Sequence, residues 1–408
     1  MKHLRLPVAL ICATMIALSS CSIKDAKDAV TPDDGGLDSI SLTPNVADGA
    51  SDVKVSTFVK VLAEDGTVSS AMLTTADGSG AIEGKVTDNG WRANSRLEPG
   101  TAYQLSVTGT GEDGKAATVT RAFTTQALTL DQQTYPAVAP LQGETVGVGM
   151  PVIVTFDLPV KNRALYEKYM KVTTDNGVTG SWTWFSDNEA HFRPEQYWPA
   201  NTKVNVRLNL NSLPAGNGVY GQQDQDISFQ VGQKVVTKVD VGKHELTYTV
   251  NDKPERTMPV TTGDDQHRTR EGVKVIMEKF SSVDMDAATT GVDSEDPGYY
   301  NISDVRWAMR LTNSGEFIHA APWSVGSQGR DNVSHGCTGM STADAKWLYD
   351  RSRRGDVVEY VDSPRPLEDR NGWTDWNVPW STWTAGSALQ AAAASAAEQP
   401  ATDAGVVD

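Results

Sequence analysis

Two related stretches decide the fold: residues 97–107, LEPGTAYQLSV, and residues 198–210, WPANTKVNVRLNL. In each of them a proline turn leads into a segment where apolar and polar residues alternate, which is typical of a half-buried strand. The prolines of the two stretches lie about one β-sandwich apart, a length of ~100 residues. We therefore predict two tandem copies of one β-sandwich, in residues 37–128 and 129–232.

Other signals in the two modules agree with this prediction. Turn sequences at 64–66 and 112–114 separate short strand-like segments, and each module closes on a strand that carries a phenylalanine, Phe123 or Phe229. The modules gather no nucleophile, base and acid, so we expect them to act as spacers. The tryptophans of the second module suit core packing better than a sugar-stacking patch; they are Trp182, Trp184 and Trp198.

The composition excludes several classes of protein. The chain has 408 residues, a length typical of two or three domains, and a formal net charge of −16, which disfavours binding to nucleic acid phosphates. A hydrophobic content of 39% indicates a folded protein. Three cysteines, Cys12, Cys21 and Cys337, are too few for a disulfide framework or for a zinc site of four cysteines.

The N-terminus is predicted to be a targeting segment. Residues 6–18 are apolar and follow two basic residues, and the run is shorter than the ~20 residues of a membrane-spanning helix. Leu18-Ser19-Ser20-Cys21 resembles the lipobox of bacterial lipoproteins, which implies cleavage after residue 20 and a lipid on the Cys21 sulfur. The alternative is an ordinary signal peptide with a chance cysteine.

Lipidation would place the protein in the cell envelope, anchored on the outer face of the cytoplasmic membrane. Residues 21–36 are polar and acidic, and we expect them to be a tether. Loss of residues 1–20 removes two basic groups and no acidic one, which leaves the remaining chain two charges more negative. It also leaves Cys337 as the single free thiol, and an unpaired thiol in an exported protein needs an explanation.

Residues 233–365 carry the predicted chemistry on a mostly-β domain with one main helix. That helix is predicted at 341–354, with Ser341 as N-cap and Gly355 as its end. Residues 280–302 are polar and contain five acidic residues, so we expect a mobile excursion there and not core structure. Segments with strand character lie on both sides of this excursion.

Two histidines lie close in sequence to the unpaired thiol. His319 ends a strand-like segment, and Ser334-His335-Gly336 leads into Cys337. A cysteine with a histidine to accept its proton is typical of a thiolate nucleophile, and Gly336 allows a tight turn that exposes backbone N–H groups. A helix that begins just after the cysteine would favour the thiolate further. The main alternative is a metal site formed by His319, His335 and Cys337 with Asp331, although this spacing matches no common zinc pattern.

These residues resemble a known signature. The stretches HAAPWSVG (319–326) and NVSHGC (332–337) resemble the motif of L,D-transpeptidases with a YkuD-type catalytic domain, and MPVTTG (258–263) resembles the upstream segment of that family. Two immunoglobulin-like modules, this domain and a tryptophan-bearing C-terminal segment are the arrangement of the mycobacterial-type enzymes. The implied fold is mostly β: two tandem immunoglobulin-like β-sandwiches followed by a YkuD-type domain with one main helix.

The resemblance implies a reaction on peptidoglycan stem tetrapeptides that needs no cofactor and no metal. Cys337 would attack the carbonyl of the third residue, release D-Ala, and pass the acyl group from its thioester to the side-chain amine of another stem, which forms a 3→3 cross-link. His319 would be the general base, His335 and Ser334 would shape the loop, and the N–H groups of Cys337 and Gly336 would face the oxyanion. Carbapenem-type β-lactams would be inhibitors.

The resemblance also suggests residues that line the donor cleft, namely Met277, Tyr300, Trp323 and Asn332, with residues 280–302 as a lid. The sequence departs from the family pattern at three positions: Thr338 and Gly339 replace a hydrophobic residue and an asparagine, and Ala320 replaces a serine. These departures put the rate and the reactivity with β-lactams in doubt. Alternative functions are an L,D-carboxypeptidase, a protein-attaching transpeptidase, or a surface-binding lipoprotein with a degenerate catalytic domain.

The C-terminal segment contains four closely spaced tryptophans in residues 366–385: Trp373, Trp376, Trp380 and Trp383. A carbohydrate-stacking strip is one interpretation. We favour docking onto the catalytic domain, because exposed tryptophans are costly. Residues 386–408 are alanine-rich and then polar, and we expect a disordered tail.

Overall fold

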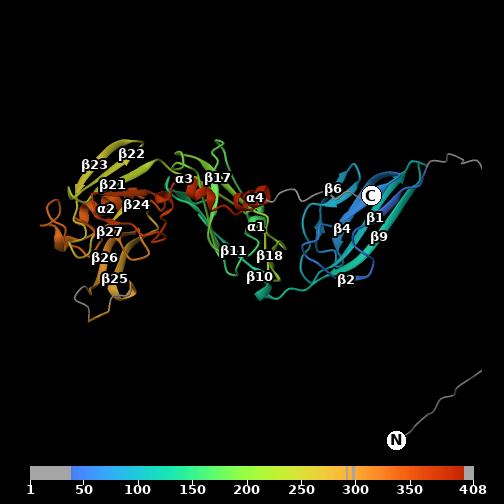
Figure 1. The fold of residues 1–408 in the computed structure, drawn as a ribbon, viewed down its shortest axis with the longest axis horizontal. Coiled ribbons are helices and arrows are strands. Elements are labelled where there is room, and N and C mark those ends of the chain that lie inside the picture. Colours follow the sequence, from blue (N-terminus) through green and yellow to red (C-terminus); the bar gives the residue numbers. More distant parts are fainter. Residues whose placement is uncertain (1–37, 291–292, 296–298, 399–408) are drawn as a thin grey trace, which may run out of the picture.

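The structure is a computed structural model that describes residues 38–290, 293–295 and 299–398. The predicted signal peptide, the tether and Cys21 lie outside the described residues. Three β-rich bodies follow one another along the chain in a row (Figure 1). Within the described part of the chain, no helix is both long and apolar enough to cross a membrane.

The first body is a sandwich of two sheets. One sheet has the order β1 (Ser41–Pro44), β3 (Lys60–Glu64), β7 (Gly90–Ala93) and β6 (Gly84–Thr87). The other has the order β2 (Ala50–Val53), β9 (Ala116–Thr125), β8 (Ala102–Gly111), β4 (Gly66–Thr75) and β5 (Ala81–Ile82). The alternation in β8 turns Tyr103, Leu105 and Val107 into the core, where the Tyr103 ring stacks on Phe123 at 5.5 Å.

The second body repeats this plan. Its sheets are β11 (Pro136–Ala139), β13 (Val152–Phe156), β16 (Glu189–Arg193) and β15 (Ser181–Ser186), and β12 (Thr145–Val146), β20 (Gln225–Val231), β17 (Lys203–Leu208) and β14 (Met170–Thr174). Smaller elements complete it: the turn η1 (Leu130–Gln132), helix α1 (Arg163–Tyr169), and strands β10 (Gln133–Thr134), β19 (Val219–Gly221) and β18 (Pro214–Gly216). Its core contains the three buried tryptophans of this module, which confirms the prediction of core packing: Trp182, Trp184 and Trp198.

A buried arginine joins the first two bodies. Arg96 of the first body donates from Nη1 to the backbone oxygens of Asn209 and Asn211, and its guanidinium lies 4.5 Å from the centre of the Tyr169 ring. Ser212 Oγ donates to Leu97 O across the same joint at 2.7 Å. These contacts fix the first sandwich against one end of the second.

The third body has two sheets that enclose helix α2. The larger has the order β23 (Lys253–Pro259), β22 (Glu245–Val250), β21 (Val235–Asp240), β29 (Val357–Val361), β24 (Arg270–Val275) and β30 (Arg365–Pro366). The smaller has the order β25 (Glu278–Asp286), β26 (Asn301–Arg310), β27 (Phe317–Ala320) and β28 (Thr338–Met340). Short turns η2 (Ala287–Thr290) and η3 (Pro322–Ser324) connect these strands.

Helix α2 spans Thr342–Arg351, and it is the one α-helix among the described residues of 233–365. Ser341 is its N-cap, with its side chain accepting from the Asp344 N–H. The helix ends earlier than the predicted Arg354, because Ser352 is extended and Asp356 draws the Arg353 N–H into a turn at 2.8 Å. Gly355 follows with a φ of 91°, which suits glycine.

The prediction of a non-core excursion at 280–302 is wrong for most of that segment. Residues 278–286 and 301–310 form the antiparallel pair β25–β26, with Phe280 opposite Ala308 and Val283 opposite Val305. Apolar and polar residues alternate along the two strands, which buries Met285 and Val305, and the many acidic residues made this alternation hard to recognise. Between the two strands, residues 291–292 and 296–298 lie outside the described residues.

The tryptophan-bearing segment contacts the third body through its first half, as expected, because Asn377 bonds Val273 in both directions and Asn371 Oδ1 accepts from the Ser314 N–H. Its last three tryptophans dock on the second body instead. It contains η4 (Asp375–Asn377) and α3 (Trp380–Ala385). Trp383 is fully buried and donates from Nε1 to Ser181 O at 2.9 Å, and Trp376 donates to Gly149 O at 2.7 Å. Arg193 of β16 lies against the rings of Trp376, Trp380 and Trp383. The second body binds these tryptophans because it presents the Arg193 guanidinium and the backbone carbonyl groups of Ser181 and Gly149 to them.

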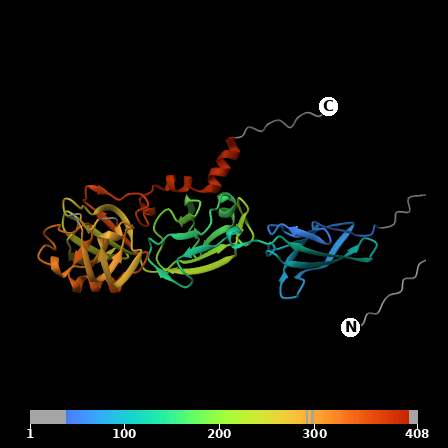
Figure 2. The same ribbon diagram turned by 90° about the horizontal axis from the view of Figure 1, so that it is seen from below.

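The expected disorder from residue 386 is also wrong in part. Residues Ala388–Glu398 form helix α4, which lies against α1 of the second body (Figure 2), and residues 399–408 lie outside the described residues. Alanine is the best helix former, and Glu167 Oε2 accepts the backbone N–H of Ala388 at 2.8 Å, which satisfies one free donor at the helix start.

We predict that Trp383→Ala releases the C-terminal segment from the second body. The change removes a fully buried indole, its hydrogen bond and its contact with Arg193, so it should cost about 3–5 kcal/mol of unfolding free energy. Urea unfolding, together with limited proteolysis of residues 366–398, measures both effects. Trp323→Ala is the matched control, because that indole is 57% exposed and its loss should leave unfolding almost unchanged. Equal stability of the two variants would contradict this account of the docking.

Candidate active site

A cavity of about 280 Å³ opens beside the end of the β27–β28 pair. Six of the predicted site residues line it, together with Gly339 and residues of the β25–β26 hairpin: Tyr300, His319, Trp323, Ser334, His335 and Cys337. The wall is mostly apolar, and its polar groups gather around the cysteine.

The pairing of β27 with β28 brings His319 and Cys337 together. The two strands run parallel, with Ile318 opposite Thr338, which sets Cys337 opposite Phe317. Because alternate residues of a strand share a face, Phe317, His319 and Cys337 all lie on the cavity side. A histidine and a cysteine that are distant in sequence thus lie on the same face of neighbouring strands.

Cys337 is a thiol in its resting state. Its Sγ donates to Gly315 O at 3.5 Å, and burial raises the pKa of the thiol to about 12, against an opposing hydrogen bond from the Phe317 backbone. The expected help from a helix N-terminus is wrong, because β28 follows the cysteine directly and α2 begins only at Thr342. A reaction through this sulfur would therefore require a base that takes the thiol proton.

His319 has the position and the protonation state that such a base requires. It is buried, and its Nδ1 lies 2.9 Å from Ala320 O, so Nδ1 carries the hydrogen and Nε2 keeps its lone pair. Burial lowers the pKa of the imidazole below its usual 6.5, so the ring is neutral at neutral pH. His319 and Cys337 are thus a neutral base and a neutral acid in one cavity.

Ser334 and Gly336 shape the turn before the nucleophile. Ser334 Oγ accepts from the Gly336 N–H at 3.1 Å and donates to Cys337 O at 2.7 Å. The expectation that the Gly336 N–H faces an oxyanion is wrong, because that group is engaged by the serine. Gly336 has a φ of 120°, which a side chain would strain. Thr269 Oγ1 donates to Gly336 O at 2.8 Å and holds the turn from the other side.

His335 lies at the mouth of the cavity between two rings. Its centroid is 5.2 Å from Tyr300 and 4.6 Å from His267, whose Nδ1 lies 3.0 Å from Asp264 Oδ1. This position fits a residue that shapes the loop. His267 escaped the sequence analysis because it is distant from the motif and carries no motif of its own.

Two predicted cleft residues are placed elsewhere. Of the described residues, those that line the cavity include neither Met277 nor Asn332. The Asn332 side chain is used inside the fold: Oδ1 accepts from Thr262 N and Oγ1, and Nδ2 donates to Val241 O. Thr261, Met285 and Ile302 line the cavity instead. The alternation within 280–302 is the signal that would have found Met285 and Ile302.

The three departures from the family pattern have different structural meanings. Ala320 is buried on the strand face opposite His319, away from the cavity. Thr338 is fully buried and its hydroxyl lies 2.7 Å from Tyr360 Oη. Gly339 lines the cavity, and a Cβ built there would lie 3.0 Å from Thr261 Cγ2 and Ala321 Cβ. Only the change at Gly339 alters the wall that a substrate meets.

The alternative metal site is not assembled. Among the described residues, no three histidines, cysteines or acidic residues form a group that could hold a metal ion. Asp331 lies with His244 in a separate surface depression. His319 and Cys337 instead line one cavity together.

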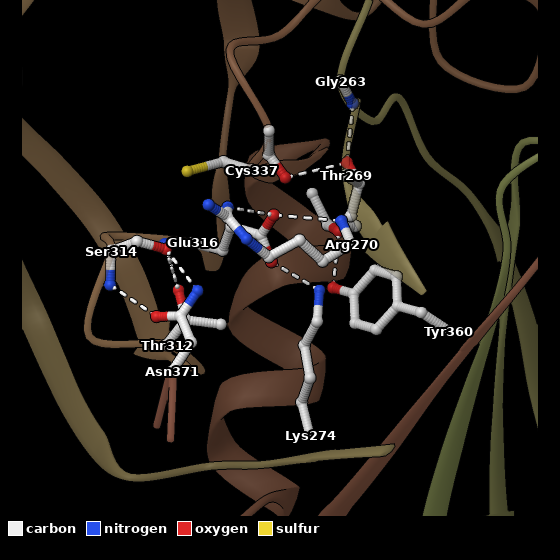
Figure 3. Close-up of polar contacts among 12 residues, drawn as sticks. Gly263, Thr269, Arg270, Lys274, Thr312, Ser314, Glu316, Cys337, Tyr360 and Asn371 are labelled. Atoms are coloured by element: carbon white, nitrogen blue, oxygen red, sulfur yellow. Dashed lines mark hydrogen bonds and ion pairs between the residues drawn. The ribbon is translucent and has the colours of Figure 1, made fainter. Parts of the chain in front are cut away.

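A buried ion cluster lies behind the cysteine (Figure 3), and the sequence analysis missed it. Glu316 Oε2 accepts from Lys274 Nζ at 2.5 Å, and Oε1 accepts from the Arg270 backbone N–H and from Arg270 Nη1, both at 3.0 Å. The Lys274 ammonium also lies 3.7 Å from the centre of the Tyr360 ring. Arg270 and Lys274 come from β24, whereas Glu316 and Tyr360 come from separate parts of the chain, and the set matches no motif.

Comparison with known proteins agrees with this geometry. A family described as a bacterial Ig domain matches residues 50–214, and the L,D-transpeptidase catalytic domain family matches residues 234–359. L,D-transpeptidase 2 of Mycobacterium tuberculosis is 36% identical over 350 residues, which is 85% of each chain. L,D-transpeptidase 5 of the same species is 36% identical over 364 residues, or 86% of this chain and 78% of that protein.

Solved structures are also similar. One of an L,D-transpeptidase in complex with imipenem is 34% identical and covers 55% of this chain and 97% of that one, with a TM-score of 0.49. Each of the two Mycobacterium tuberculosis relatives matches 85% or more of this chain, which is more than the catalytic domain alone. The chain is a mostly-β protein with an Ig-like region and a YkuD catalytic domain, and it belongs to the L,D-transpeptidase family.

Proposed function

We propose that the protein forms 3→3 cross-links in peptidoglycan through a thioester on Cys337. The observation that carries this proposal is the placement of Cys337 and neutral His319 on one face of the β27–β28 pair, in one cavity. The donor would be a stem tetrapeptide and the acceptor the side-chain amine of a second stem.

The first half-reaction follows from the two side chains. His319 Nε2 takes the proton from Cys337 Sγ while the sulfur attacks the carbonyl carbon of the third stem residue. The carbonyl π electrons move to oxygen, where the Cys337 N–H would stabilise the oxyanion. Collapse of this intermediate breaks the bond to D-Ala, and His319 returns its proton to the leaving amine.

The second half-reaction reverses these roles. The acceptor amine attacks the thioester carbon, His319 takes a proton from the amine nitrogen, and the sulfur leaves with a proton from His319. An amide replaces the thioester, and the thiol is regenerated. Water in place of the amine would give a carboxypeptidase, and an amine on a protein would give a protein-attaching enzyme.

The same proposal assigns the protein to the outer face of the cytoplasmic membrane. Its support is the lipobox-like sequence that ends at Cys21 and the apolar run before it. A lipid on Cys21 would leave the three bodies outside the membrane, near the cell-wall polymer.

We predict that Cys337→Ala abolishes both the acyl-enzyme and the 3→3 product. The variant lacks the sulfur that forms the thioester, so mass spectrometry of reactions with purified tetrapeptide stems should show unreacted substrate. Cys21→Ala is the matched control, since it removes a cysteine outside the catalytic body and should leave the reaction in solution unchanged. Cross-links formed by Cys337→Ala would end the proposal. Reactions with and without an acceptor stem separate cross-linking from hydrolysis.

We predict that acylation of Cys337 by a carbapenem loses rate as the pH falls below 6.5. Protonated His319 cannot accept the thiol proton, and burial places the pKa of this histidine below 6.5. Intact-protein mass spectrometry at a series of pH values follows the adduct. His319→Ala should slow acylation by about 10²–10⁴-fold and remove the acid limb. An acid limb above pH 7 in the unmodified protein would contradict the assignment of the base.

A further inference from the structure

The ion cluster behind Cys337 lies against the turn that presents the nucleophile. A Cβ built on Gly336 would lie 3.6 Å from Glu316 Oε1, so the carboxylate sits directly behind the residue that precedes Cys337. The Gly315 carbonyl, one residue before Glu316, accepts from the Cys337 thiol. Glu316 also leads into β27, which carries His319. Glu316 thus lies directly behind the turn that presents Cys337, and immediately before the strand that carries His319.

This location is electrostatically costly for the reaction. When the proton leaves Cys337, a negative charge forms on sulfur beside a carboxylate that is only 3% exposed. Like charges in a poorly solvated site repel strongly, because little water screens them. The Coulomb effect of Glu316 does raise the pKa of Cys337, after the larger effect of burial.

Lys274 supplies the opposite charge from β24. Its side chain is fully buried, its ammonium contacts Glu316 Oε2, and Figure 3 shows it between that carboxylate and the Tyr360 ring. The Lys274 charge lowers the pKa of Cys337, opposing Glu316. Arg270 holds the other carboxylate oxygen but is itself paired with Glu368 at the surface.

We propose that Lys274 is a positioning residue for the nucleophile: its buried ammonium neutralises the Glu316 carboxylate that backs the Gly336–Cys337 turn, and so lets negative charge develop on the sulfur. This inference rests on the proposed role of Cys337 as nucleophile. Lys274 does not touch the substrate, because its side chain has no exposed surface. The proton itself still passes from Cys337 Sγ to His319 Nε2.

The ionisable groups around Cys337, besides Arg270, lie on two sides of the sulfur. On the cavity side are the two histidines of the motif and the Tyr300 hydroxyl from the β25–β26 hairpin. Behind the sulfur are Glu316, Lys274 and the Tyr360 hydroxyl, which is held by Thr338. Of the groups behind the sulfur, Lys274 is the base whose ammonium contacts Glu316; burial lowers the pKa of this ammonium, and the Glu316 charge opposes that effect.

The test is the rate at which iodoacetamide alkylates Cys337 in the full chain. Only the thiolate reacts, so the rate at a fixed pH below the thiol pKa reports that pKa. Mass spectrometry of the peptide that spans residues 331–346 separates Cys337 from the other cysteines. Lys274→Met should raise the pKa of Cys337 by about one unit, because Arg270 keeps Glu316 ionised while the lysine charge is gone. Alkylation should therefore slow about 10-fold at each pH below that pKa.

The double variant separates charge from shape. Lys274→Met with Glu316→Gln removes both charges, so alkylation should return to within about 2-fold of the unmodified protein. Lys279→Met is the matched control: it removes a partly buried lysine that contacts Tyr349 and Ser352 in the same body, and it should change nothing. If the lysine acted only through packing, the double variant would stay slow.

Two outcomes would overturn the proposal: unchanged alkylation in Lys274→Met, or no recovery in the double variant. If Lys274→Met does not fold, two other variants provide the comparison, because Glu316→Gln and the double variant differ only in the Lys274 charge. Glu316→Gln must then react about 10-fold faster than the double variant. Alkylation needs no peptidoglycan, so these results stand even if the enzyme makes no 3→3 cross-links. With an active enzyme, Lys274→Met should lower the acylation rate constant and leave KM unchanged.

Discussion

The parallel pairing of β27 with β28 is the constraint on which the active site depends. Ile318 opposite Thr338 sets the register, and a shift by one residue would turn either His319 or Cys337 away from the cavity. Hydrogen bonds from neighbouring residues help to hold this register. Thr261 bonds Gly339 in both directions, and Ser334 and Thr269 hold the turn that leads into the strand.

The same pairing explains why burial and reactivity coexist. A cysteine held against the sheet has a pKa that burial raises, so its sulfur keeps its proton at neutral pH. The histidine on the next strand has a lowered pKa for the same physical reason, and it therefore stays neutral and ready. Burial shifts the two groups in opposite directions, and both shifts suit a proton transfer that occurs with bond formation.

The sequence predicts the reacting residues of the site, but it does not predict the residues that surround them. Cys337, His319 and Ser334 follow from motif and residue type, and the alternating stretches at 97–107 and 198–210 predict the two sandwiches. Met277 and Asn332 were misplaced because a motif says nothing about which face a flanking side chain takes. The hairpin at 280–302 was missed because surface acids masked its period of two. The Lys274–Glu316 pair depends on strands from separate parts of the chain, which one sequence does not bring together.

The C-terminal segment has a practical consequence for anyone who labels this protein. The chain leaves the catalytic body after β30, crosses back to the second body, and ends the described region at α4 beside α1. A fluorescent protein or affinity tag joined after α4 would start from the middle of the three bodies (Figure 2). The mouth of the cavity, on the body at the far end, would stay open to a bulky polymer.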